Sequence, residues 1–132
     1  MGRSLEAFHQ LQLPRLVVSA VVASELLVGA QSAHRERAVR RTLVEPFRAR
    51  RRFVVPAWST WAIATDIDRR LRARPAMRAR LAERSFFQDI LIAASARELG
   101  ATIVTLNTAD FGLIARHVDI KFVEPWPRLP AA

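Results

Sequence analysis

Residues 85–111, with the sequence SFFQDILIAASARELGATIVTLNTADF, contain the clearest structural pattern in this chain. Ser85 and Gln88 have the spacing of a capping box, which predicts that a helix begins at Ser85. The helix is expected to run to Leu99 and to end at Gly100, a residue that often follows a helix in a left-handed conformation. The pattern therefore predicts a helix that leads directly into the apolar segment that follows it.

Strand and helix patterns alternate along the rest of the chain, without an internal repeat. Strands are expected at residues 15–22, 53–56, 101–106 and 120–123, the first of which runs into a helix that ends near Gly29. Helices are expected at residues 33–52 with a break around Pro46, at 57–73, after Pro75 as far as residue 84, and at 108–116. Prolines 125, 127 and 130 end the regular structure. Strands separated by helices imply right-handed crossovers and a parallel sheet covered on both faces, so the expected fold is α/β with three layers.

Length and composition indicate one globular domain. The 132 residues suffice for a single core, and 51% of them are hydrophobic. The longest apolar run, residues 16–29, is shorter than the roughly 18 residues of a membrane helix and contains polar residues. Residues 1–15 show no signal-peptide pattern, and cysteine is absent. We therefore expect a cytoplasmic protein, spanning residues 1–132 as one domain, with no membrane segment.

The net charge of +9 makes nucleic acid the first partner to consider. Two arginine-rich segments, residues 35–52 and 69–84, are candidates for contacts with phosphates. Three other interpretations stay open. Lys121 is the only lysine, so a GC-rich genome alone would produce this arginine bias. The arginines can also be an ordinary solvated helix face, or they can bind an acidic protein.

Three acidic residues differ from the others, most of which lie close to arginines in the sequence. Glu25 lies in an otherwise apolar helix, Asp89 in the first turn of the helix from residue 85, and Asp110 just beyond the carboxyl end of strand 101–106. Ligands of parallel sheets gather at the carboxyl ends of strands. Buried carboxylates without a partner are costly, so they require a cation, hydrogen-bond donors or a proton. Three converging acids indicate a site for Mg²⁺ or Mn²⁺.

Each of these acids also has a purely structural interpretation. Asp89 can interact favourably with the N-terminal dipole of its helix. Asp110 can belong to a helix cap together with Asn107 or Thr108. Glu25 can pair with an arginine of the basic segment. Other chemistries have weaker candidates, because the chain has no cysteine and no glycine-rich phosphate loop, and its three histidines are scattered.

Three segments occur in an order and spacing that a known family shares. Residues 17–29, VVSAVVASELLVG, contain Glu25; residues 89–96, DILIAASA, followed by LGAT at 99–102, contain Asp89; and residues 105–111, TLNTADF, fit the pattern T-x-N-x-x-D-F. Together they resemble the PIN-domain family, especially the VapC-type toxins of type II toxin–antitoxin systems. The resemblance covers residues 16–127. It implies a PIN-like fold with a central parallel sheet.

The sequence departs from this family at its N-terminus. The family begins with a strand in the middle of the sheet, and this strand ends in an aspartate that supplies the first metal ligand. Residues 1–15 contain no aspartate and no strand-like run, and residues 1–8 resemble the loop and helix that follow that strand. We therefore expect the first strand to be absent, so that strands 16–20 and 101–105 lose a shared neighbour or close on each other. Either the true start lies upstream, which the intact remaining acids favour, or the copy is truncated.

For an intact protein, the resemblance implies a Mg²⁺-dependent endoribonuclease. The catalytic residues would be Glu25, Asp89 and Asp110, which would hold one or two Mg²⁺ ions. Mn²⁺ is the possible substitute for Mg²⁺. Thr105 and Asn107 would orient these ligands. The family also implies RNA as substrate, neutralisation by a cognate antitoxin, and a homodimer.

The main alternative is a degenerate, non-catalytic PIN-like domain that binds RNA or an antitoxin without cleaving RNA. The missing aspartate supports it, and predicts that residues 1–132 alone cleave RNA weakly or not at all. Restoring the upstream strand is expected to recover Mg²⁺-dependent cleavage. A DNA-binding module ranks last, because the sequence has no helix-turn-helix or zinc pattern.

Overall fold

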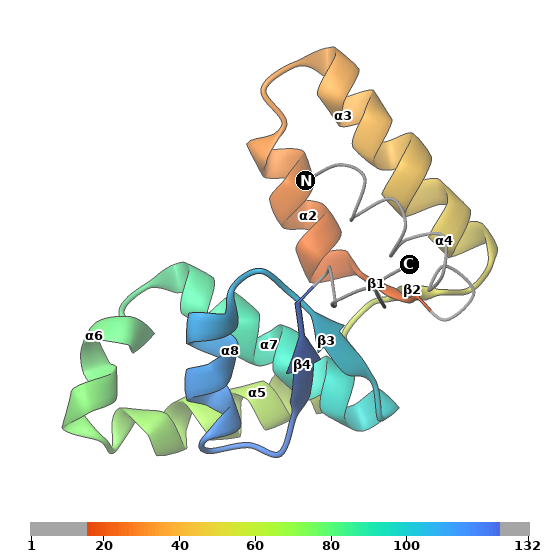
Figure 1. The fold of residues 1–132 in the computed structure, drawn as a ribbon. Helices are drawn as coiled ribbons and strands as arrows, with labels where there is room; N and C mark the ends of the chain where they lie inside the picture. The colour runs from red at the N-terminus through yellow and green to blue at the C-terminus, as the bar shows by residue number, and fades with distance from the viewer. Residues whose placement is uncertain (1–15, 125–132) are drawn as a thin grey trace, which may run out of the picture.

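The computed structural model describes residues 16–124, in which helices and short strands alternate (Figure 1). The strands are β1 (Val18–Ser19), β2 (Phe53–Val54), β3 (Thr102–Val104) and β4 (Lys121–Val123). The α-helices are α2 (Ala20–Gly29), α3 (Ala33–Val39), α4 (Glu45–Ala49), α5 (Trp58–Arg72), α6 (Arg78–Leu81), α7 (Arg84–Leu99) and α8 (Thr108–Ala115). A π-helical segment, η2 (Arg40–Val44), joins α3 to α4, and a 3₁₀ turn, η3 (Pro75–Met77), precedes α6.

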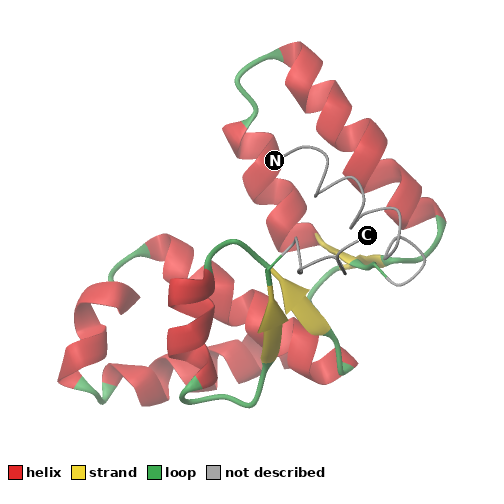
Figure 2. Ribbon diagram, viewed as in Figure 1, coloured by secondary structure: helices red, strands yellow, loops and turns green. Residues whose placement is uncertain are grey.

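The four strands form two separate parallel pairs. In one sheet Val18 of β1 lies opposite Phe53 of β2, and in the other Ile103 of β3 lies opposite Phe122 of β4. Figure 2 shows the two pairs as distinct yellow ribbons, and no strand among residues 16–124 joins them. The predicted α/β class and parallel pairing are confirmed. Among residues 16–124, β1 and β3 have no shared neighbour and do not close on each other. The expected absence of a strand between them concerns residues 1–15, which lie outside the described part of the chain.

Helix α7 forms the centre of the hydrophobic core. It packs against α5 and α8, and it is apolar around most of its circumference, as a helix enclosed by neighbours must be. Phe86 and Ile90 of α7 are fully buried, together with Ile67 of α5 and Ile114 of α8. The helices α2 and α3–α4 extend away from this core as a separate hairpin, with β1 and β2 at its base (Figure 1). The core therefore fixes α7 and α8 relative to each other.

The end of α7 is as predicted and its start is not. Gly100 has φ of +65° and its backbone N–H donates to carbonyl oxygens of the last turn, so the expected left-handed cap is confirmed. Helix α7 begins at Arg84 with Glu83 as N-cap, and no side chain caps it. Ser85 is therefore not the N-cap, because the backbone N–H of Phe86 already donates to the carbonyl of Glu83 at 3.1 Å. The capping-box spacing was not sufficient to define the start.

The first strand is shorter than residues 15–22. Ser19 caps α2, since its hydroxyl accepts a hydrogen bond from the backbone N–H of Val21 at 3.1 Å. Helix therefore replaces strand from Ala20 onward, an ambiguity that is usual for short β-branched runs. Residues 1–15, and the prolines at 125, 127 and 130, lie outside the described residues.

Two other local predictions need correction. Pro46 does not break the helical stretch: it lies in the first turn of α4, where its missing N–H costs no intrahelical bond, and the π-helical segment η2 leads into it. The apolar stripe of α5 is buried at Ala64, Ile67 and Leu71, but Trp58 is 78% exposed. Among the described residues, no helix is both long and apolar enough to cross a membrane.

Candidate active site

Asp89 and Asp110 are brought together by the packing of α8 against α7. Asp89 lies in the second turn of α7, because the helix begins at Arg84. Asp110 lies in the first turn of α8. The dipole interpretation of Asp89 loses its basis, since the influence of a helix N-terminus falls off within the first turn.

Asn107 connects the two acids. Its side-chain Nδ2 donates to Asp89 Oδ2 at 3.2 Å and to Asp110 Oδ2 at 3.1 Å. Its Oδ1 accepts from the backbone N–H of Asp110 at 3.3 Å, so Asn107 is also the N-cap of α8. Asp110 therefore does belong to a helix cap with Asn107, as the capping interpretation proposed. The same asparagine also donates a hydrogen bond to Asp89.

Thr105 fixes the loop that carries Asn107. Its hydroxyl accepts a hydrogen bond from the backbone N–H of Asn107 at 2.9 Å, and its own N–H donates to the carbonyl of Val123 at 3.0 Å. The end of β3 is thus tied to β4, and the position of Asn107 follows from the sheet. Thr105 therefore holds Asn107 in position, and Asn107 orients the two aspartates without being a ligand itself.

The electrostatics of Asp89 reflect its burial and, to a smaller extent, the neighbouring negative charges. Only 9% of this residue is exposed, and burial is the largest of the causes that together raise the pKa of its carboxyl to about 7. The negative charges of Asp110 and Glu25, and side-chain hydrogen bonding with Asp110, contribute smaller parts of the same rise. Glu25 therefore lies within electrostatic reach of the Asp89–Asp110 pair.

Glu25 itself differs from its sequence prediction. It is exposed on α2, and not buried among apolar residues, because α2 belongs to the hairpin that extends from the core. Partial burial raises its pKa. Within residues 16–124 it forms no ion pair, so the pairing of Glu25 with an arginine finds no support there.

Arg80 contacts the acid pair, and sequence reasoning missed it. Its Nη1 lies 2.7 Å from Asp110 Oδ1, with 46% of the Arg80 side chain and 14% of the Asp110 side chain exposed. The two residues are thirty positions apart, and α6 brings them together by its packing against α7. Arginines are so frequent in residues 69–84 that no sequence pattern distinguishes this one.

The donor chemistry of the site fits a hard divalent cation. The available ligands are carboxylate oxygens, and a cation would stabilise the charged form of Asp89, which burial and then the neighbouring acids disfavour. The acids do not form a complete set of metal ligands. Among the described residues, no three Asp, Glu or His side chains are close enough together to hold a metal ion. The arrangement is a close pair, Asp89 and Asp110, with Glu25 at longer range and Arg80 on one oxygen of Asp110.

We predict that Arg80→Ala tightens the binding of Mn²⁺ severalfold, because it frees Asp110 Oδ1 and removes a positive charge from the site. Isothermal titration calorimetry measures the change. Arg78→Ala, which removes an exposed charge from the same helix, is the matched control and should leave the affinity nearly unchanged. Equal affinities in Arg80→Ala and the unmodified protein would show that Arg80 does not compete for Asp110.

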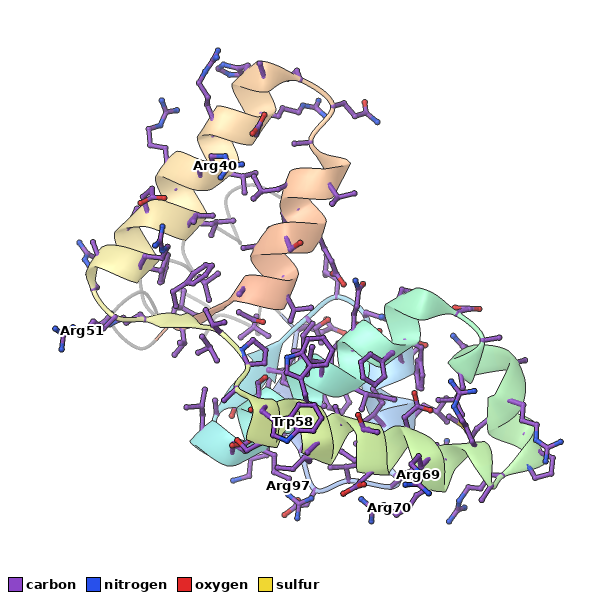
Figure 3. The ribbon with its side chains drawn as sticks, turned by 180° about the vertical axis from the view of Figure 1, so that it is seen from behind. Arg40, Arg51, Trp58, Arg69, Arg70 and Arg97 are labelled. Atoms are coloured by element: carbon purple, nitrogen blue, oxygen red, sulfur yellow. The ribbon has the colours of Figure 1, made fainter. Side chains whose placement is uncertain are left out.

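The arginine-rich segments are exposed. On the α3–α4 arm, Arg40 pairs with Glu36 at 3.1 Å and Arg48 with Glu45 at 3.5 Å, both at the surface. Arg51, in the turn that follows α4, points outward (Figure 3). Such surface pairs contribute little to stability. The exposed arginines are therefore available to bind a polyanion. An ordinary solvated helix face would be exposed in the same way, so both interpretations stay open.

A family model described as PIN domain matches residues 3–116 of the chain. No curated protein matches it. The matched range includes β1 to β3 and α2 to α8, and therefore Glu25, Asp89, Asn107 and Asp110.

Proposed function

This chain belongs to the PIN domain family, whose members are generally nucleases that use divalent metal ions, and we propose that it is a Mg²⁺-dependent endoribonuclease of the VapC toxin type. Its proposed substrate is RNA, and Mn²⁺ is expected to replace Mg²⁺. Neutralisation by an antitoxin protein and assembly as a homodimer belong to the same proposal.

The observation that carries this proposal is the acid pair held by Asn107. Asp89 is buried, its pKa is raised to about 7, and it shares a hydrogen-bond donor with Asp110. Natural proteins rarely keep such unfavourable crowding of carboxylates without a use for it, and perturbed acids of this kind are concentrated at functional sites. The negative charge of Glu25, on α2, also raises the pKa of the Asp89 carboxyl.

The residues of the chain divide the work of the reaction. Asp89 and Asp110, with Glu25, would hold the cation, and Asn107 keeps the two aspartates at a fixed separation. A divalent cation there supplies Lewis acidity toward a phosphodiester and lowers the pKa of water. Arg80 lies at the edge of the acids and would contact the substrate phosphate once it leaves Asp110.

The charge of the chain supports a polyanionic substrate. The net charge of +9 attracts RNA from solution, and the exposed arginines of the α3–α4 arm and of α5–α6 would bind its backbone. Contacts of this kind position a phosphodiester without selecting its sequence.

The test is incubation of the protein with a 5′-labelled single-stranded RNA, with and without Mg²⁺. We expect slow cleavage that requires Mg²⁺ or Mn²⁺ and stops when EDTA is added. Cleavage that continues unchanged in EDTA would contradict the proposed mechanism, because it would not need the acids.

A second candidate function is supported by two observations. Arg80 occupies an oxygen of Asp110, and β1 and β3 are not joined by a strand among residues 16–124. Both fit a PIN domain that binds RNA or an antitoxin but does not cleave. Salt-dependent RNA binding without any Mg²⁺-dependent product, at high protein concentration, would establish this second function in place of the first.

A further inference from the structure

A cavity of about 400 Å³ lies between α5 and the turn that follows α8. Its apolar floor consists of Ile67, Leu71 and Val118, all buried. Its lining also includes Arg70, Arg74 and His117. A volume of this size is within the range of sites for small ligands. The cavity therefore combines apolar lining residues with arginine and histidine side chains.

Helical spacing explains the cationic side of the cavity. Arg70 and Leu71 lie three and four residues after Ile67, and Arg74 lies four and three residues after them, so the four share one face of α5 and its end. His117 reaches the opposite side because the chain turns sharply after α8, with its backbone N–H donating to the carbonyl of Ile114 at 2.9 Å.

The positive charges around this cavity have no acidic partners in the part of the chain that the structure describes. Within residues 16–124, Arg70, Arg74 and the neighbouring Arg116 form no ion pair. Burial lowers the pKa of His117, and the charges of Arg74 and Arg116 lower it further. The neutral form of the imidazole is therefore favoured, and the arginines give the cavity a positive potential that an anion would stabilise.

We propose that this cavity binds the phosphate of a nucleotide-sized ligand, with Arg70 and Arg74 on the phosphate and the base or sugar against Ile67, Leu71 and Val118. The guanidinium groups match phosphate oxygens in geometry and charge. The apolar floor supplies a surface for the remainder of the ligand. A free nucleotide and the 5′-phosphate end of an RNA present the same group.

This site is separate from the acid pair. Asp110 lies at the start of α8 and His117 follows its end, and the helix between them spans about 12 Å. Nothing in the proposed binding requires a metal ion. The inference therefore stands or fails independently of the ribonuclease proposal.

The experiment uses the full chain in EDTA, so that no RNA is cut. Uridine 5′-monophosphate is titrated while ¹H–¹³C NMR follows the His117 ring, with uridine and inorganic phosphate as comparison ligands. We expect the monophosphate to bind more tightly than either, and to raise the pKa of His117 toward its ordinary value.

Single charge removals test the assignment. Arg70→Ala and Arg74→Ala are each expected to weaken monophosphate binding about tenfold. Arg69→Ala removes the same charge from an exposed neighbour on α5 that does not line the cavity, and should leave binding nearly unchanged (Figure 3). Equal weakening in all three variants, or no shift of the His117 signals at millimolar ligand, would overturn the proposal.

A second pair of ligands identifies the source of the phosphate. A short RNA with a 5′-phosphate is compared with the same RNA ending in a 5′-hydroxyl. A shift of His117 by the phosphorylated RNA alone assigns the cavity to RNA ends. A shift by the free monophosphate and by neither RNA assigns it to free nucleotides. If both RNAs shift His117 equally, the site does not recognise a terminal phosphate, which contradicts the proposal.

Discussion

Asp89→Asn is expected to make the metal-free protein more stable above pH 7 while it removes metal-dependent RNA cleavage. In the folded protein the pKa of Asp89 is about 7, compared with 3.8 as its ordinary value. The unfolded chain therefore loses this proton first, so the free energy of unfolding falls as the pH rises from 3.8 to about 7 and is lowest above that range. This rise of the pKa by about 3 corresponds to about 4 kcal/mol.

Asparagine has nearly the same shape and carries no charge. Its Oδ1 can accept the hydrogen bond that Asp89 now receives from Asn107, so the variant should recover a large part of those 4 kcal/mol at pH 8. Urea unfolding at pH 5 and pH 8 measures the effect. The gain should be clearly larger at pH 8 than at pH 5, because at pH 5 folded Asp89 still holds its proton and only part of the loss has occurred.

The same substitution should reduce RNA cleavage by about a hundredfold or more, because it removes a carboxylate from the proposed metal ligands. Asp66→Asn is the control, since Asp66 is exposed on α5 and far in sequence from the acids. It should change neither stability nor cleavage. A loss of stability in Asp89→Asn at pH 8 would contradict the electrostatic account of Asp89, and full cleavage by this variant would contradict its proposed catalytic role.

The second large effect is expected from Phe86→Ala. Phe86 is fully buried (0% exposed) at the centre of the core, one turn before Asp89 on α7. Its removal leaves a cavity between α5, α7 and their neighbours, which is expected to cost about 3–5 kcal/mol. Chemical unfolding followed by circular dichroism measures the loss. Because α7 carries Asp89, divalent-cation binding should weaken in parallel with folding.

Leu99→Ala is the matched control, since Leu99 is on the same helix and is 57% exposed. It should change the free energy of unfolding by less than about 1 kcal/mol. If Phe86→Ala were as mild as Leu99→Ala, α7 would not be the central helix of the core.

Sequence reasoning succeeded where local patterns are strong. The course of α7, β3 and α8 follows from apolar periodicity, from Gly100 as a left-handed cap, and from Asn107 before a helix. These features depend on neighbours in the sequence, so one chain suffices to predict them. The exact start of α7 did not follow, because the backbone can satisfy its first N–H groups without Ser85.

Features set by distant residues were less predictable. Glu25 was expected to be buried because α2 is apolar, but Leu26 and Val28 beside it are exposed as well. The apolar sequence of α2 therefore does not mean that this helix is buried by the other described residues. The contact of Arg80 with Asp110 depends on how α6 packs, which no local pattern encodes.

The separation of the described strands into two pairs was expected from the sequence, and this expectation came from the family pattern and not from local periodicity. Each parallel strand needs a neighbour for its free backbone groups, and residues 1–15 lack the strand-like run that the family pattern places between β1 and β3. The two separate strand pairs agree with that prediction.

The central claim is that Glu25, Asp89 and Asp110 serve one divalent cation. Substoichiometric Mn²⁺ added to ¹⁵N-labelled protein tests it directly, because paramagnetic relaxation broadens the amide signals nearest to the ion. The account predicts that the signals of all three residues broaden together and return when EDTA is added. Broadening confined to acids of the α3–α4 arm, such as Glu36 and Glu45, with these three signals unchanged, would contradict it.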